Sequence, residues 1–225
     1  MDLSKYPLDI ILVPLSFCLT ACYHGYIWQS SKAQNTTTSI GITMKRRARW
    51  VQSILQENKK KDILGVQSLR NLLMSTILSA TVAMLINTAL AALANNTYNA
   101  FRLHGGGILG LQGGPMVVLK YASISLLLLI SFLCSSMGVG FIIEGNFLLN
   151  APADAVMFDG HVEKMIKRGW VLATVGNRVL FSTFPFLLWL YGPVALAVSS
   201  VGLILVFYCF DFESTGLKQA HIIKH

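Results

Sequence analysis

The sequence predicts an all-α integral membrane protein, with five transmembrane helices and one cytoplasmic amphipathic helix. Hydrophobic residues make up 54% of the 225 residues and charged residues only 12%, whereas a soluble domain carries about 25% charged residues. The mean hydropathy is +0.58. The apolar residues fall in runs of about 20, the length that crosses a bilayer as a helix. The basic residues gather in the segments between alternate runs, which is the pattern of a multispan topology.

The apolar runs are expected to be the spans of one membrane domain, residues 1–225. They cover residues 8–28, 68–94, 117–149, 171–190 and 194–210. Only Tyr191, Gly192 and Pro193 separate the last two runs. One continuous helix through both would be roughly 60 Å long, about twice the thickness of the hydrocarbon core. The helix is therefore expected to break at Gly192 and Pro193.

The basic residues predict the orientation of the spans. Thirteen Lys and Arg residues lie in the segments after the first and third runs and in the C-terminal tail, and three lie on the opposite side. Because Lys and Arg are retained on the cytoplasmic side, we expect the N terminus outside and the C terminus cytoplasmic, in the plasma membrane or an endomembrane. Asp2 and Asp9 offset Lys5, so the first span lacks the positive flank of a signal peptide and is expected to be retained.

The net charge of +8 follows from this topology and does not indicate a nucleic-acid partner, because aromatic residues do not interleave the basic ones. His24, His104 and His161 are far apart, and no set of residues has nucleophile or metal spacing. We therefore expect no enzyme activity, no metal and no cofactor. The cysteines all fall within predicted spans, where they act as small apolar residues. They are Cys18, Cys22, Cys134 and Cys209.

Residues 42–64, between the first two spans, are expected to form an amphipathic helix with its apolar residues on one side. The basic residues at its start, with a tryptophan at headgroup depth, form a candidate surface for anionic lipid. This surface comprises Lys45, Arg46, Arg47, Arg49 and Trp50. Such charges attract anionic lipid at about 1 kcal/mol each. They could equally serve only to enforce the topology, and the sequence leaves both interpretations open.

The informative ionisable residues inside the predicted spans are Arg70, Glu144 and Arg178, because a charge there costs about 2.5 to 3.5 kcal/mol. We expect them at one level in the inner leaflet. Their positive excess would suit an anion or a lipid phosphate. The alternative is that Glu144 pairs with Arg178 or Arg70 for structure only. The full candidate site for an ion or lipid headgroup comprises Arg70, Asn71, Glu144, Asn146, Arg168, Asn177 and Arg178.

Small residues mark two further segments. Ser136 and Gly140 are four residues apart in the third run, with Glu144 the next step along, so another helix can approach closely there. Packing within the chain is favoured over a seam between two copies. Residues 95–116 are glycine-rich and are expected to be a flexible external loop. Gly114 is followed by Pro115, not by the Lys-Ser/Thr ending of a phosphate-binding loop.

Polar residues occur in a fixed order along most of the chain. They are Arg47-Ala48-Arg49-Trp50, Glu57-Asn58, Asp62, Gln67-Ser68-Leu69-Arg70-Asn71, Glu144-Gly145-Asn146-Phe147, Lys167-Arg168-Gly169-Trp170 and Asn177-Arg178. In this order the chain resembles the domain-of-unknown-function family 599, from about residue 42 to 212. The resemblance implies a multispan membrane protein and supplies no catalytic residue. The glycine-rich loop and the tail of low charge look like those of a plant-type member.

The expected function is an oligomeric channel or transporter, in which the inner-leaflet cluster lines a path that favours anions. Five spans are few for a transporter, so a pore would form within or between the subunits of a homo-oligomer. The alternative is a non-conducting scaffold or anionic-lipid-binding protein that uses the basic helix. The expected partners are membrane lipids and further copies of the chain.

Overall fold

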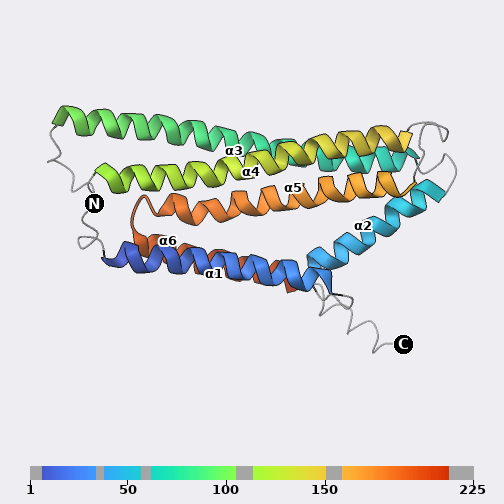
Figure 1. The fold of residues 1–225 in the computed structure, drawn as a ribbon, viewed down its shortest axis with the longest axis horizontal. Helices are drawn as coiled ribbons and strands as arrows, with labels where there is room; N and C mark the ends of the chain where they lie inside the picture. Colours follow the sequence, from blue (N-terminus) through green and yellow to red (C-terminus); the bar gives the residue numbers. More distant parts are fainter. Residues whose placement is uncertain (1–6, 34–37, 57–61, 105–113, 151–158, 213–225) are drawn as a thin grey trace. The chain divides into compact units, whose positions relative to one another are not determined.

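A computed structural model describes residues 7–33, 38–56, 62–104, 114–150 and 159–212. In this part of the chain there are six α-helices (Figure 1). They are α1 (Pro7–Lys32), α2 (Ser39–Gln56), α3 (Asp62–His104), α4 (Gly114–Asn150), α5 (Asp159–Leu188) and α6 (Pro193–Phe212). All except α2 are long and apolar enough to cross a membrane. The all-α class is confirmed, and each predicted run corresponds to one of these five helices.

The helix α3 extends well beyond its predicted span, whereas α4 exceeds its predicted span by only four residues. They contain 43 and 37 residues, which corresponds to roughly 65 and 55 Å at 1.5 Å per residue. Because α3 continues to His104, the expectation of a loop from residue 95 onward is wrong, and only 105–113 lie outside the described residues. Hydropathy predicts the part of a helix that faces lipid but not where the helix ends, because each residue added to a nucleated helix gains a hydrogen bond at little cost.

The helix α5 likewise begins before its predicted span, at Asp159 instead of residue 171. Lys164, Lys167 and Arg168 therefore lie within the helix and not in a loop before it. Lys and Arg are good helix formers, so a basic segment that ends the apolar run does not end the helix.

The predicted break between the last two runs is confirmed. The helix α5 ends at Leu188 and α6 begins at Pro193. Gly192 has a φ of 155°, a backbone conformation that residues with a β-carbon rarely adopt. Pro193 then occupies the first helical position, where its missing N–H leaves no hydrogen bond unmade.

The helix α2 begins earlier than predicted, at Ser39. Thr38 is fully buried and caps it, because the Gly41 N–H donates to Thr38 Oγ1 at 3.4 Å and the Ile42 N–H to the Thr38 carbonyl at 3.0 Å. The helix ends at Gln56 and α3 starts at Asp62, so the single segment 42–64 is wrong at both ends. Residues 57–61 of that segment lie outside the described residues.

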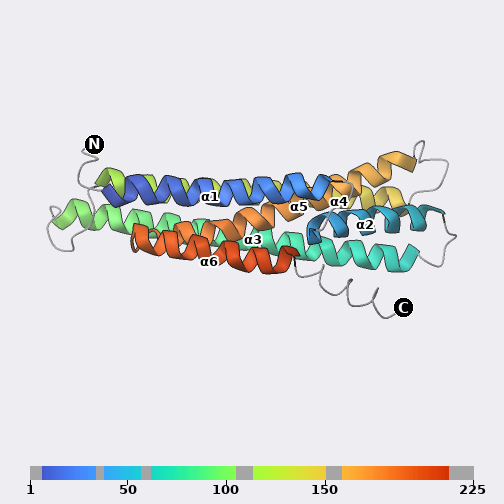
Figure 2. The same cartoon turned by 90° about the horizontal axis from the view of Figure 1, so that it is seen from below.

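The chain divides into two compact units, one formed by α3, α4 and α5 and the other by α1, α2 and α6. In the first unit, α4 packs along both α3 and α5 (Figure 1). In the second unit, α1 packs along α6, and α2 contacts both of them (Figure 2). The first unit is thus one continuous segment of the chain, whereas the second joins helices from its two ends.

Glycines bring α4 and α5 close together. A β-carbon on Gly145 would lie 2.6 Å from Ile166 Cγ1, and one on Gly169 would lie 3.0 Å from the backbone nitrogen of Ile142. The seven-residue spacing that separates Gly138 from Gly145 recurs between Gly169 and Gly176, and it keeps the contact on one side of each helix. Close backbone approach of this kind is how membrane helices pack without a hydrophobic driving force.

The expectation that Ser136 and Gly140 pack within the chain is wrong. Ser136 is exposed, and a β-carbon on Gly140 would meet no atom within 4 Å. The helix α4 instead turns Ser131 and Ser135, both fully buried, toward α5. The sequence showed small residues on two sides of α4, and only packing decided which side faces α5.

Candidate functional site

Two hydrogen bonds between side chains fix the level of α3 against its neighbours. Ser79 Oγ donates to Asn177 Oδ1 of α5 at 3.2 Å. Ser125 Oγ of α4 donates to Asn87 Oδ1 at 2.7 Å. Such bonds contribute about 0.6 kcal/mol on average in a membrane protein. More importantly, they show which residues of the three helices lie at the same height along the helix axes.

The contacts between α4 and α5 define a second register. Ser131 Oγ donates to the Gly176 carbonyl at 2.7 Å, whereas Gly145 lies against Ile166. The two helices are therefore antiparallel. From Ile166 to Gly176, α5 rises by roughly 15 Å.

The structure does not bring the candidate site residues to one level. Because Gly145 lies against Ile166, Glu144 is level with the first turns of α5. Arg178 lies roughly 17 Å further along α5, beyond the reach of an ion pair with Glu144. The physical reason is the early start of α5 at Asp159, which places Arg178 five turns into the helix instead of two, at about 3.6 residues per turn.

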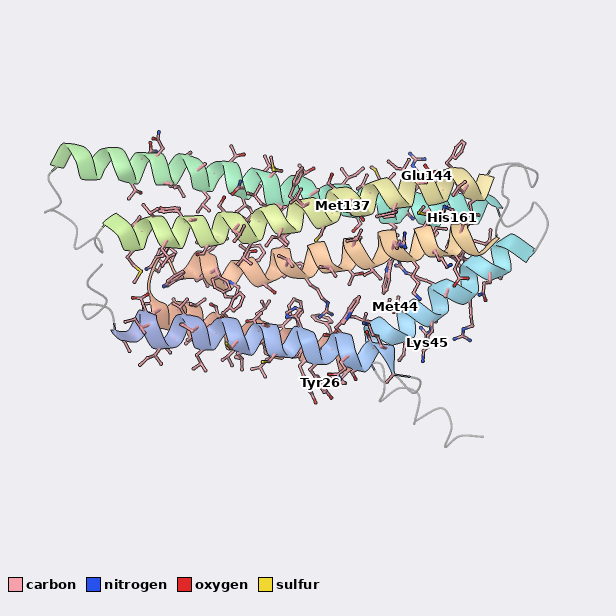
Figure 3. All side chains as sticks on the ribbon, in the orientation of Figure 1. Tyr26, Met44, Lys45, Met137, Glu144 and His161 are labelled. Carbon is pink, nitrogen blue, oxygen red and sulfur yellow. The ribbon has the colours of Figure 1, made fainter. Side chains whose placement is uncertain are left out.

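Arg70 and Glu144, in contrast, are level with each other. Arg70 precedes Asn87 by 17 residues and Glu144 follows Ser125 by 19, a difference of roughly 3 Å along the helices. Both side chains are exposed, and neither forms an ion pair with another residue that the structure describes. Figure 3 shows Glu144 and His161 at the same end of their unit. The expected structural pairing of Glu144 with Arg70 or Arg178 is thus not formed within the described residues.

The other four candidate residues have different environments. Asn71 and Arg168 are exposed, and Asn146 is half-buried. Asn177 accepts the hydrogen bond from Ser79, and Arg178 beside it is half-buried within the span. The polar groups inside the unit therefore serve at least in part to join its helices.

Sequence reasoning missed a buried lysine. Lys120 Nζ donates to the Trp189 carbonyl at 3.0 Å and lies 5.3 Å from the Trp189 ring centroid. Trp189 follows the last residue of α5, so the ammonium group binds a carbonyl at the negative end of the helix dipole. Lys120 is the fourth residue of its predicted span and is one of the three basic residues that the sequence analysis counts on the outer side.

A second missed group lies in the other unit. Asp211 of α6 is only 2% exposed, and its carboxylate accepts a hydrogen bond from the Tyr23 hydroxyl of α1 at 2.8 Å. The Phe207 ring lies parallel to the ring of Tyr23, with 6.5 Å between their centroids, and edge-on to His24 at 5.5 Å. Asp211 is the first residue after the predicted span, so it is not among the ionisable residues predicted to lie inside the spans.

The basic residues of α2 divide by exposure. Lys45, Arg46 and Arg49 are exposed. Arg47 is half-buried, and burial lowers the pKa of its guanidinium group. An arginine nevertheless stays charged in a protein. The apolar residues Val51 and Ile54 are buried, so protein and not lipid covers that side of the helix.

Potential metal ligands do not gather in the described ranges. Among these residues, no three His, Cys, Asp or Glu side chains lie close enough to hold a metal ion. The cysteines Cys18, Cys22 and Cys209 are exposed on their helices, and Cys134 is half-buried.

The five long apolar helices, with interhelical hydrogen bonds and close glycine contacts among α3, α4 and α5, fit a helical integral membrane protein. The chain belongs to the family described as "Protein of unknown function, DUF599", which matches residues 11–216. The match begins within α1, so it includes the first span that the resemblance had left out. No curated protein and no solved structure matches the chain.

Proposed function

We propose that this protein is a non-conducting membrane protein that binds anionic lipid through the basic side of α2. The basic side comprises Lys45, Arg46 and Arg49. The supporting observation is that these three side chains are exposed while Val51 and Ile54, elsewhere around the same helix, are buried. A helix that protein holds by its apolar side can present a fixed set of charges to lipid headgroups.

Electrostatic attraction is the main term in this binding. Each basic residue near an anionic membrane contributes about 1 kcal/mol. Because Val51 and Ile54 are buried in protein, they supply little of the apolar insertion that usually anchors an interfacial helix. Lipid binding by α2 should therefore weaken as salt screens the charges, over a distance of about 10 Å at 0.1 M ionic strength.

The proposed topology places α2 on the cytoplasmic side, with the N terminus outside, in the plasma membrane or an endomembrane of a plant-type family member. The positive bias supports this orientation, and the cytoplasmic leaflet is the one that carries anionic lipid. We expect a tag after His225 to resist external protease in intact cells, and a tag before Met1 to be cut. Cleavage of the C-terminal tag alone would contradict the topology.

The second candidate is an oligomeric channel or transporter that favours anions. The observation in its favour is Arg178, a half-buried cation within a span, next to Asn177. Charged residues at such depth often mark an ion pathway. The close contacts between α4 and α5 leave no room for a path along that seam. A pore of this kind would have to run elsewhere in the chain or between copies of it.

Flux through liposomes separates the two candidates. We expect liposomes that contain the purified full chain to release chloride no faster than empty liposomes do, because glycine contacts close the seam between α4 and α5. Flux above that background that disappears in a folded Arg178→Gln variant would contradict the non-conducting proposal and establish the channel. The melting temperature of the variant controls for its folding.

A further inference from the structure

Arg70 and Glu144 both point away from their own unit, each at about the same angle from the contact between α3 and α4. Successive residues of a helix are turned by about 100°. Arg70 is 17 residues from Asn87, which marks the side of α3 that faces α4, so it lies about 100° from that side. Glu144 is 19 residues from Ser125, which marks the side of α4 that faces α3, so it too lies about 100° away.

Both residues also turn away from α5. Ser79 marks the side of α3 that faces α5, and Arg70 lies about 180° from it. Ser131 marks the side of α4 that faces α5, and Glu144 lies about 140° from it. The two charges are therefore exposed on the outer face of the α3–α4 pair, at the same level and with opposite signs.

We propose that this outer face binds a second copy of the chain, with Arg70 of each copy paired to Glu144 of the other. In a ring of four helices, each helix has its two neighbours at about 90° to one another, close to the angles above. A two-fold axis along the membrane normal places α3 beside the partner's α4 and α4 beside the partner's α3. The level positions of Arg70 and Glu144 then give two identical ion pairs, one for each copy.

The remainder of the face fits the same partner. Gly140 lies on this side of α4 with no atom near its β-carbon position, and Ser136 is exposed beside it. Two copies of α4 can therefore approach each other closely near the axis. Lipid tails could cover the exposed Leu133 and Met137, but they cannot pair a carboxylate with a guanidinium group. The complementary charges are what favour a second copy over lipid.

Charge reversal tests this pairing. The fraction of dimer is measured by single-molecule photobleaching of the labelled full chain in liposomes, over a range of protein densities. We expect Glu144→Arg and Arg70→Glu each to raise the dimer dissociation constant at least about tenfold, because each places like charges together twice. The variant that carries both changes should recover the affinity, because it restores both pairs in reversed orientation.

Lys167→Glu is the matched control, because Lys167 is exposed on α5 near the same level as Glu144 and lies outside the proposed interface. It should leave dimerisation unchanged. An independent probe is Gly140→Cys in a chain whose four natural cysteines are changed to serine. A short bismaleimide should join two such chains across the two-fold axis.

Three results would overturn the proposal. They are a chain that stays monomeric at every density, single variants that dimerise as the unmodified chain does, and a folded double variant that fails to recover affinity. If Arg70 instead binds a lipid phosphate, Arg70→Glu would have no effect on dimerisation, and that result also rejects the interface. The proposal does not depend on lipid binding by α2, since neither Arg70 nor Glu144 belongs to its basic side.

Discussion

Replacing Gly176 by alanine is expected to lower the melting temperature of the full chain by about 6 °C. The new β-carbon would lie 3.0 Å from the Ser131 carbonyl oxygen and 3.0 Å from the Ser135 backbone nitrogen, and closer still to Ser135 Oγ. A side chain can rotate away, but two backbone atoms cannot, so α4 and α5 must separate. Overpacking of this kind costs about 2 kcal/mol, and each kcal/mol corresponds to about 2 to 4 °C for a chain of this length.

Gly202→Ala is the control, since the same substitution within α6 meets no atom within 4 Å. It should leave the melting temperature unchanged or raise it slightly, because alanine is the better helix former by about 1 kcal/mol. Thermal unfolding of both variants in the same detergent gives the comparison. Equal melting temperatures for the Gly176 and Gly202 variants would show that the glycine seam does not hold α4 and α5 together.

The helical class and the spans could be predicted because the length of an apolar run reports directly on the thickness of a bilayer. The break at Gly192 and Pro193 could be predicted for the same reason, since one helix through both runs is too long. Helix ends could not, because α3 and α5 continue through residues that are polar but favourable to helix. Thr38 is a preferred cap residue, but Asn35, Thr36, Thr37 and Ser39 beside it are too, so residue type alone could not identify the cap of α2.

The candidate site was less predictable than the fold, because its geometry depends on the register between helices. Placing Arg178 level with Glu144 assumed that α5 starts where its apolar run starts. The contact of Gly145 with Ile166 shows a different register. Lys120 and Asp211 are buried although they stand at the edges of predicted spans. Their partners, the Trp189 carbonyl and the Tyr23 hydroxyl, lie far away in the sequence.

Neutralising the basic side of α2 is expected to weaken binding of anionic lipid to the full chain roughly 100-fold. Changing Lys45, Arg46 and Arg49 together to glutamine removes three exposed charges, each worth about 1 kcal/mol beside anionic headgroups. About 1.4 kcal/mol corresponds to a factor of ten in affinity. The fold should be retained, because the buried Val51 and Ile54 are unchanged and the three side chains are exposed.

The matched control removes the same number of charges from another exposed basic surface. Lys164, Lys167 and Arg168 lie on the first turns of α5 and are all exposed. Their joint change to glutamine lowers the net charge equally but leaves α2 intact. We expect this control to reduce lipid binding much less than the α2 variant does. An equal reduction would indicate that net charge, and not the basic side of α2, attracts the lipid.

The most direct measurement is a titration of the purified full chain with phosphatidylglycerol or phosphatidylcholine, in which native mass spectrometry counts the bound lipids. We expect the unmodified chain to prefer phosphatidylglycerol, the α2 variant to lose that preference, and the α5 control to keep it. Raising the salt concentration before analysis should reduce binding to the unmodified chain toward that of the α2 variant. Equal binding of phosphatidylglycerol by the unmodified chain and by the folded α2 variant would contradict lipid binding through α2.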